Sequence, residues 1–180
     1  MRSRTYKWLL GPYGRAFLYV APRHQEGIPL EQTFFSRCDV GSDRRPYMRD
    51  LAHVGGAPRF DMGERDHFVA LEMAAIGMQM LAEWGIEAVS ARLRMLNDRL
   101  ANALHGLDVE IPEPRVCAPH ILSLGFPGGM PANLVAALAE KNWFAAARLG
   151  RLRISPHVYN DEEDVARFVT ALHHVLRYLR

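Results

Sequence analysis

Apolar residues recur at intervals of three and four positions in three stretches of the chain, and each stretch is predicted to form an amphipathic helix. The first apolar stripe consists of Phe68, Leu71, Ala75, Met78 and Ala82. The second consists of Val89, Leu93, Leu96, Leu100 and Ala103. The third consists of Val165, Phe168, Val169, Leu172, Leu176 and Leu179. Stripes of this kind indicate helices that pack against a core.

Polar residues and a glycine mark the ends of these helices. Asp61 with Glu64, and Asn160 with Glu163, have the spacing of a capping box, in which two side chains satisfy free N–H groups at a helix start. Gly85 follows the first stripe and is a stop signal between the first two helices.

Short apolar runs predict strands. Residues 16–21 (AFLYVA) are apolar and aromatic and are followed by Pro22, which predicts a buried strand. Further strands are predicted at residues 107–111, 120–126, 143–147 and 151–155, with a helix over 132–141. This alternation predicts an α/β fold in which residues 106–180 form a small sheet covered on one face by helices, while the strand at 16–21 belongs to another sheet.

Residues 22–60 show no sustained period and contain several prolines, glycines and arginines. An irregular segment of this length in a compact domain is usually functional or packed against another chain. We therefore expect it to form an active-site wall or a subunit contact.

Composition and charge exclude several classes of function. Lys and Arg number 22 and Asp and Glu 20, and the basic residues are scattered, so nucleic acid is not an expected partner. No run approaches the roughly 18 apolar residues of a membrane span. The N-terminus reaches Gly11 and Pro12 too early for a signal peptide, which predicts a cytoplasmic protein.

The histidines and cysteines predict no metal site and no disulfide. His173 and His174 are neighbours on a predicted helix, so they cannot point together at one metal ion. Cys38 and Cys117 fit no disulfide framework and are interpreted as structural.

Candidate chemistry begins at Lys7, which lies between Tyr6 and Trp8 just before a Gly-Pro-x-Gly turn. We expect this lysine to be partly buried, which would lower its pKa from about 10.4 and make the amine nucleophilic toward an aldehyde. On spacing alone, the favoured interpretation is a lysine whose stem lies on aromatic rings while its ammonium group reaches water.

Three segments resemble, in order and spacing, those of the class V aminotransferase family of pyridoxal-phosphate (PLP) enzymes. YKWLLGPYGRAFLYV resembles the segment of the Schiff-base lysine. RFDMGERDHFVALEMA resembles the Arg-Phe-acidic-x-Gly segment that leads into a helix, and RLRISPHVYNDEEDVARFV resembles the late Arg-x-Ser segment. Cysteine desulfurases, kynureninases and isopenicillin-N-epimerase-like enzymes share this outline.

The resemblance implies a fold-type-I PLP-dependent transferase. Residues 1–60 would be the end of the large PLP-binding domain, residues 61–105 connecting helices, and residues 106–180 the small C-terminal α/β domain. The cofactor would be PLP, the substrate a small amino acid and the assembly a homodimer. Because family members are much longer, we expect a partial chain that lacks the N-terminal half and is inactive by itself.

By position, the resemblance implies three site residues. Lys7 would hold PLP as a Schiff base and then move the α-proton of the substrate. Arg153 would grip the α-carboxylate of the substrate with its planar fork, and it shares a predicted strand face with Arg151. Gly63 would approach the cofactor phosphate; without the resemblance it is interpreted as a helix N-cap.

Two positions depart from the family pattern. Arg4 stands where relatives usually carry Ser or Thr, three residues before the lysine, and Glu64 stands where many carry Thr after the glycine. An arginine could serve the phosphate by its charge, whereas a glutamate would repel it.

The predicted reaction is transaminase-like, with epimerisation and carbon–sulfur lyase chemistry left open because all three begin from the same Schiff base. Desulfuration is disfavoured because residues 143–153 contain no cysteine to accept sulfur, and Cys117 lies well before Arg153. The non-enzymatic alternative is an inactive remnant or a module kept for dimerisation.

Overall fold

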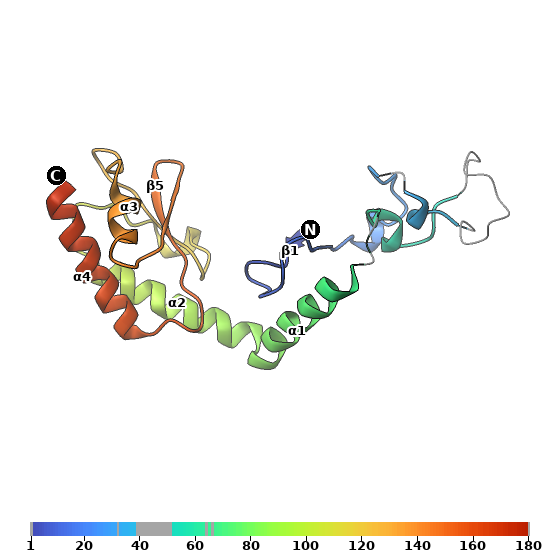
Figure 1. Ribbon diagram of the computed structural model, residues 1–180, viewed down its shortest axis with the longest axis horizontal. Coiled ribbons are helices and arrows are strands. Elements are labelled where there is room, and N and C mark those ends of the chain that lie inside the picture. The colour runs from blue at the N-terminus through green and yellow to red at the C-terminus, as the bar shows by residue number, and fades with distance from the viewer. Residues whose placement is uncertain (1, 32, 39–51, 64, 66, 180) are drawn as a thin grey trace. The chain divides into compact units, whose positions relative to one another are not determined.

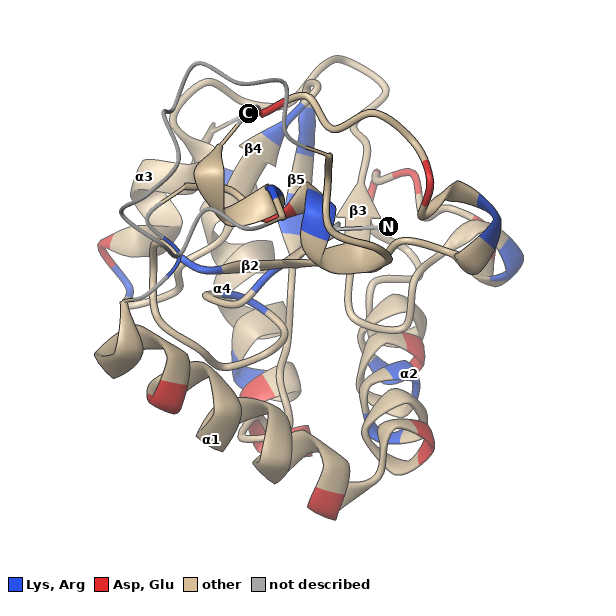
Figure 2. Ribbon diagram, turned by 90° about the vertical axis from the view of Figure 1, so that its right-hand side faces the viewer, with Lys and Arg blue, Asp and Glu red and all other residues tan. Residues whose placement is uncertain are grey.

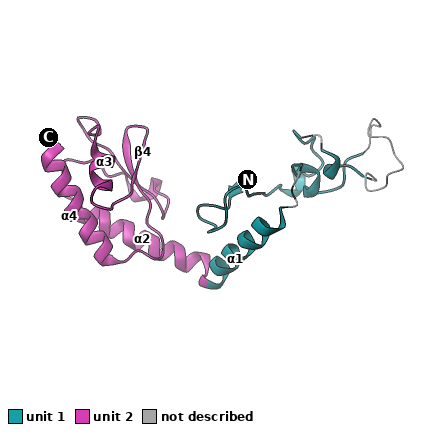
Figure 3. Cartoon of the chain, in the orientation of Figure 1, with its two compact units in different colours: residues 1–83 teal, residues 84–180 magenta. Residues whose placement is uncertain are grey.

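The chain consists of two compact units, residues 1–83 and residues 84–180 (Figure 3). The computed structural model describes residues 2–31, 33–38, 52–63, 65 and 67–179 (Figure 1). Among these residues, no helix combines the length and the apolar character needed to cross a bilayer.

Unit 1 begins with a two-stranded antiparallel sheet made by β1 (Arg2–Arg4) and β2 (Ala16–Leu18). Ser3 pairs with Phe17 at its centre. The predicted buried strand at 16–21 is shorter than expected, and its residues are exposed. The prediction of burial is wrong because, among the described residues, no third strand pairs with this sheet and the residues of β2 are left exposed.

The helix α1 (Phe68–Trp84) forms where the first apolar stripe predicted it, but it buries a different face. Its buried residues are Ala70, Ala74, Gly77 and Leu81. Phe68 and Leu71, which begin the predicted stripe, are 77% and 45% exposed. Because α1 is apolar on almost every side and carries few charges (Figure 2), periodicity could not select the buried face.

The start of α1 also differs from the prediction. The ring Nδ1 of His67 accepts the N–H of Ala70 at 3.1 Å, so His67 caps the helix. Asp61 instead ends a short 3-10 helix, η3 (Ala57–Phe60), and pairs with Arg65. Its predicted capping-box partner Glu64 lies outside the described residues.

Residues 22–60 are irregular, as predicted, over the part that the structure describes. Besides η3 they form two short 3-10 helices, η1 (Pro22–His24) and η2 (Phe34–Ser36). The guanidinium of Arg59 is buried among them and donates to the carbonyl of Val54 at 3.0 Å and to the carboxylate of Glu26 at 2.9 Å. Polar contacts rather than apolar packing therefore hold this segment.

Unit 2 contains a three-stranded antiparallel sheet in the order β3-β5-β4 (Figure 1). The strands are β3 (Leu122–Leu124), β4 (Ala146–Arg148) and β5 (Arg151–Ile154), each shorter than predicted. At residues 107–111 the structure has only one isolated bridge, between Glu110 and Gly125. The proline at position 112 has no N–H to extend that ladder.

Three helices pack with this sheet: α2 (Ile86–Ala103), α3 (Leu134–Ala139) and α4 (Glu162–Leu179). Leucines from the sheet and from the helices are fully buried together, namely Leu93, Leu96, Leu124, Leu134, Leu138, Leu152 and Leu172. The stripes predicted for the second and third helices therefore supply the core of unit 2.

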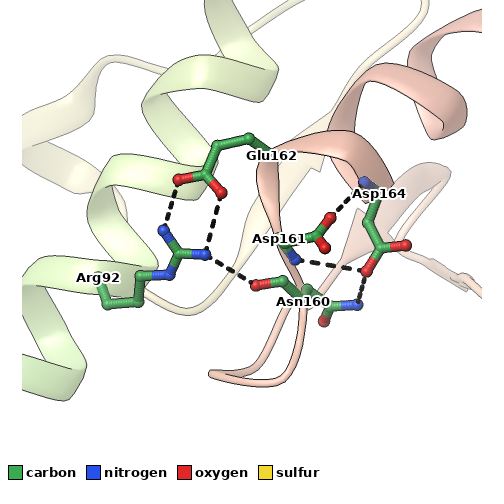
Figure 4. Close-up of polar contacts among 5 residues, drawn as sticks. All are labelled: Arg92, Asn160, Asp161, Glu162 and Asp164. Atoms are coloured by element: carbon green, nitrogen blue, oxygen red, sulfur yellow. Dashed lines mark hydrogen bonds and ion pairs between the residues drawn. The ribbon is translucent and has the colours of Figure 1, made fainter.

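The start of α4 is tied to α2 by polar contacts (Figure 4). Arg92 donates to both carboxylate oxygens of Glu162, at 2.6 and 3.2 Å. The capping box lies one residue away from the predicted one, because the N–H of Asp164 donates to Asp161 at 2.8 Å. The predicted cap Asn160 instead accepts the N–H of His157 with its side-chain oxygen.

Candidate functional site

Lys7 lies in the turn that follows β1, and the backbone on both sides of it is held by hydrogen bonds. Thr5 is fully buried, and its hydroxyl donates to the carbonyl of Pro12 at 2.7 Å. The N–H of Gly11 donates to the carbonyl of Thr5 at 2.8 Å, and that of Leu10 to the carbonyl of Lys7 at 3.2 Å. These bonds fix the position of the lysine backbone.

This turn packs closely against α1. A Cβ at Gly77 would overlap the carbonyl oxygen of Leu9 and lie 3.0 Å from the carbonyl carbon of Leu10. A Cβ at Gly11 would lie 3.3 Å from the Cα of Ala74. The glycine and alanine face of α1 therefore lets the backbone next to Lys7 approach the helix directly.

The Lys7 side chain is exposed, so the predicted burial is wrong. Its Nζ lies 5.6 Å from the centroid of the Tyr6 ring, and that ring stacks on Tyr13 with 4.3 Å between centroids. This geometry matches the simpler interpretation of the sequence, a lysine whose stem lies along aromatic rings. The amine is accessible to a ligand that approaches from solvent.

Arg4 and Tyr6 flank the lysine on its N-terminal side. Arg4 Nη1 donates to the Tyr6 hydroxyl at 2.9 Å. This hydrogen bond lowers the pKa of Tyr6 from its ordinary value, with smaller contributions from the charges of Arg4 and Lys7. The partner of Arg4 is neutral, so its positive charge is not compensated by this contact.

A hollow of about 670 Å³ lies beside the hairpin, within unit 1. Its wall comes partly from β1, the turn and β2, and partly from the residues before α1 and from α1 itself. The lining residues are Arg4, Tyr6, Gly14, Arg15, Ala16, Phe17, Leu18, Phe60, Asp61, Met62, Arg65 and Leu71. The hollow is therefore next to both the lysine segment and the segment that contains Gly63.

Arg15 joins these two walls. Its Nη1 donates to the carbonyl of Arg65 and its Nη2 to the carbonyl of His67, both at 2.6 Å. Its Nε is buried and has no hydrogen-bond partner among the described residues. Arg15 was not predicted as a site residue, although a basic residue directly after the turn glycine Gly14 and before an apolar strand is a usable signal.

Gly63 lies between η3 and α1, five residues before the first helical residue, so the N-cap interpretation is wrong. Its N–H donates to the carboxylate of Glu31 at 3.2 Å. A Cβ at this position would come within 3.3 Å of a methyl carbon of Thr33. The donor that a phosphate would use at Gly63 is thus occupied by a carboxylate.

Arg153 lies in unit 2 on β5, opposite Ser123 and Ala146. Its neighbour Leu152 is fully buried in the core, so Arg153 points to the other face of the sheet, as predicted. Its Nε is buried and, among the described residues, has no hydrogen-bond partner. A buried guanidinium donor of this kind is costly unless an acceptor reaches it.

Arg151, two residues away, provides the contrast. It donates to the carboxylate of Glu110 at 3.0 Å, to the carbonyl of Ser123 at 3.1 Å and to the Ser123 hydroxyl at 3.3 Å. Arg151 is thus satisfied within the protein, whereas Arg153 has donor capacity left for a ligand.

The predicted site residues lie in both units: Lys7 and Gly63 belong to unit 1 and Arg153 to unit 2. Within unit 1, the hollow brings residues next to Lys7 and residues next to Gly63 to one place.

Comparison with protein-family models gives no match, and neither does comparison with curated proteins. Solved structures do match. The apo cysteine desulfurase of Thermococcus onnurineus NA1 has a TM-score of 0.78 and 22% identity, covering 98% of this chain and 46% of that one. The S-sulfonic acid form of the cysteine desulfurase CsdA of Escherichia coli has a TM-score of 0.77 and 20% identity, with 96% and 45% covered.

A NifS-like protein also matches, with a TM-score of 0.59 and 24% identity over 72% of this chain and 39% of that one. The chain thus spans less than half the length of these structures. The predicted α/β fold is confirmed: the chain has the fold of part of these structures, which are two cysteine desulfurases and a NifS-like protein.

Proposed function

We propose that the chain is part of a PLP-dependent enzyme that acts on an amino-acid substrate with transaminase-like chemistry. Lys7 holds the cofactor and Arg153 binds the substrate carboxylate. Epimerisation and carbon–sulfur lyase chemistry are alternative reactions of the same site. Because the chain spans less than half the length of its structural neighbours, the proposal for this chain by itself is limited to cofactor capture.

The observation that carries the proposal is the free donor capacity of Arg153. A carboxylate accepts two parallel hydrogen bonds from a guanidinium, and such charge-assisted pairs are about twice as strong as neutral hydrogen bonds. Arg153 is half-buried, and no carboxylate pairs with it among the described residues. An amino-acid carboxylate would therefore satisfy the arginine and fix the orientation of the Cα–H bond.

The residues of unit 1 also fit PLP. When bound, PLP supplies an aldehyde and an electron-withdrawing ring. The Lys7 Nζ is accessible and, in its unprotonated form, would hold the cofactor by its aldehyde. The same amine, when free, would accept the Cα proton of the substrate. The hydrogen-bonded turn fixes the backbone that carries this amine.

Desulfuration is not proposed for this chain, although its structural neighbours are cysteine desulfurases. The β4–β5 hairpin, which leads to Arg153, has Leu149 and Gly150 at its tip and contains no cysteine. The thiol of Cys117 instead faces the carbonyl of Glu113 at 3.4 Å. A sulfur acceptor placed before the carboxylate arginine is therefore missing from this segment.

The homodimer is part of the proposal, and an apolar stripe on α1 supports it. Five exposed side chains recur at helical spacing on this helix: Val69, Met73, Ile76, Met80 and Trp84. Exposed apolar stripes of this kind mark contact surfaces.

Cofactor capture is tested by recording the absorbance of the purified chain with PLP before and after borohydride reduction. The expected result is a visible band that reduction bleaches while it fixes the cofactor on the protein. Lys7→Ala should lose both signals, whereas Arg153→Gln should keep them. A wild-type spectrum identical to that of Lys7→Ala would identify the chain as a remnant or a dimerisation module.

A further inference from the structure

The charges around the hollow of unit 1, which Tyr6 lines, are unbalanced. Of its described lining residues, three are arginines and one is an aspartate. Asp61 pairs with Arg65, which leaves Arg4 and Arg15 without a carboxylate partner among the described residues. Two arginines at one hollow that have no carboxylate partner among the described residues favour an anionic ligand.

We infer that this hollow binds the phosphate group of a phosphorylated aromatic ligand, with Arg15 and Arg4 as the phosphate-binding side chains. The inference rests on the proposed function, since it identifies the residues that would bind the PLP phosphate in this chain. It also gives a role to Arg4, which stands where a hydroxyl was expected from the family pattern.

Arg15 is suited to this role because its guanidinium is held before a ligand arrives. Two neutral backbone carbonyls fix its Nη atoms and leave its charge intact, and its buried Nε still has no partner among the described residues. A charge that is fixed in advance loses little side-chain entropy on binding. A phosphate in the hollow would accept a charge-assisted hydrogen bond from this guanidinium.

Arg4 offers a second donor from the neighbouring strand. One of its nitrogen atoms donates to the Tyr6 hydroxyl, and its side chain is otherwise exposed. Guanidinium groups match phosphate geometry better than hydroxyls do and add charge. The substitution of a hydroxyl by an arginine therefore changes how the phosphate would be held without removing its binding site.

The remaining wall suits an aromatic ring. Tyr6, Phe17 and Phe60 line the same hollow as the two arginines, and Tyr6 directly precedes Lys7. The volume of about 670 Å³ lies within the range of small-molecule sites. A wall that contains both arginines and aromatic rings suits a ring that carries a phosphate.

The test compares pyridoxine 5′-phosphate with pyridoxine by isothermal titration calorimetry. The two compounds differ only in the phosphate, and neither has an aldehyde, so Lys7 forms no bond with them. We expect wild type to bind the phosphorylated compound about tenfold more tightly, and Arg4→Gln and Arg15→Gln each to reduce this preference by about three- to tenfold. Arg23→Gln, an exposed arginine outside the hollow, should leave it unchanged.

Equal affinities of wild type for the two compounds, including no detectable binding of either, would overturn the inference. A preference that survives in Arg4→Gln and Arg15→Gln would overturn it as well. Arg15 also ties the hairpin to the residues before α1. A lost preference for the phosphorylated compound in Arg15→Gln is therefore interpreted only if circular dichroism shows that the variant is folded. If it is not folded, Arg4→Gln alone decides the outcome. Failure of Lys7 to capture PLP is measured separately and concerns the proposed function alone.

Discussion

The two units of the chain bury different kinds of residue. Unit 2 buries large aliphatic side chains, such as Leu93, Leu124 and Leu172. In unit 1 the fully buried side chains include the hydroxyls of Thr5 and Ser36, and the buried face of α1 consists mostly of Ala and Gly. Unit 2 therefore has a hydrophobic core of its own, whereas unit 1 depends on hydrogen bonds and close backbone packing.

Unit 1 also exposes large apolar side chains of the kind that usually form a hydrophobic core. Ile28 and Leu30 are 85% and 103% exposed, and both Phe68 and Tyr13 are close to 80% exposed. Surfaces of this composition mark places where another protein body packs. Among the described residues, the unit with the candidate cofactor lysine therefore exposes more large apolar side chains than unit 2, where Phe144 and Leu149 are also exposed.

The largest expected effect comes from the core of unit 2. Leu172→Ala should destabilise the chain by about 2–5 kcal/mol, because it removes a fully buried side chain and leaves a cavity. Leu71→Ala, which removes a side chain that is 45% exposed on α1, should lower the free energy of unfolding much less. Urea denaturation followed by far-UV circular dichroism compares the two, and equal losses would contradict the difference between the units.

Close packing of the Lys7 turn on α1 gives the next effect. Gly77→Ala places a Cβ against the Leu9 carbonyl oxygen and should destabilise unit 1 by about 1–3 kcal/mol. The matched control is Gly55→Ala, because a Cβ there meets no atom within 4 Å. Faster hydrogen exchange of residues 68–84 in Gly77→Ala alone is the expected readout. Unchanged exchange in both variants would show that the turn does not depend on this contact.

The exposed stripe of α1 should govern self-association. Light scattering on a sizing column should give a dimer for wild type and a smaller mass for Ile76→Glu with Met80→Glu, because charges on a buried interface are costly. Gln79→Glu, at a polar and exposed position of the same helix, adds a negative charge outside the stripe and serves as the control. A wild-type monomer would remove the support that this stripe gives to the homodimer.

The smallest effect concerns the polar contact between α2 and α4 (Figure 4). The hydrogen bond from Arg92 lowers the pKa of Glu162, so the contact stabilises the fold at neutral pH and is lost as the pH falls below about 4.5. Glu162→Gln should therefore be less stable than wild type at pH 7 and approach it in acid. The free energy of unfolding is measured for each protein as a function of pH. Glu163→Gln, next to Glu162 and exposed, should show the wild-type pH dependence. The same pH dependence in Glu162→Gln and wild type would contradict this assignment.

The difference between the units also explains what could be predicted from the sequence. The stripes at Leu93 and Leu172 alternate with charged residues, so the pattern identified both the helix and its buried face. On α1 the apolar residues surround the helix, and the buried face was set by tertiary contacts of Gly77 that no periodicity contains. The same holds for the hairpin, where an apolar run predicted a strand but not whether anything covers it.

For the candidate site, family segments pointed to Lys7, Gly63 and Arg153, and their roles stay predictions. The free donor capacity of Arg153, the occupied N–H of Gly63 and the exposure of Lys7 depend on which partners lie nearby in space. Arg15 was missed for the same reason. Its side chain bonds the carbonyl of His67, which is so distant in the sequence that local patterns cannot predict the contact.

The most direct measurement is peptide mapping of the chain after incubation with PLP and borohydride. The sequence contains two lysines, Lys7 and Lys141, and both are exposed, so Lys141 is an internal control for non-specific reaction. The account predicts that the reduced adduct forms on Lys7 at PLP concentrations that leave Lys141 unmodified. Equal modification of the two lysines would contradict the claim that Lys7 holds the cofactor.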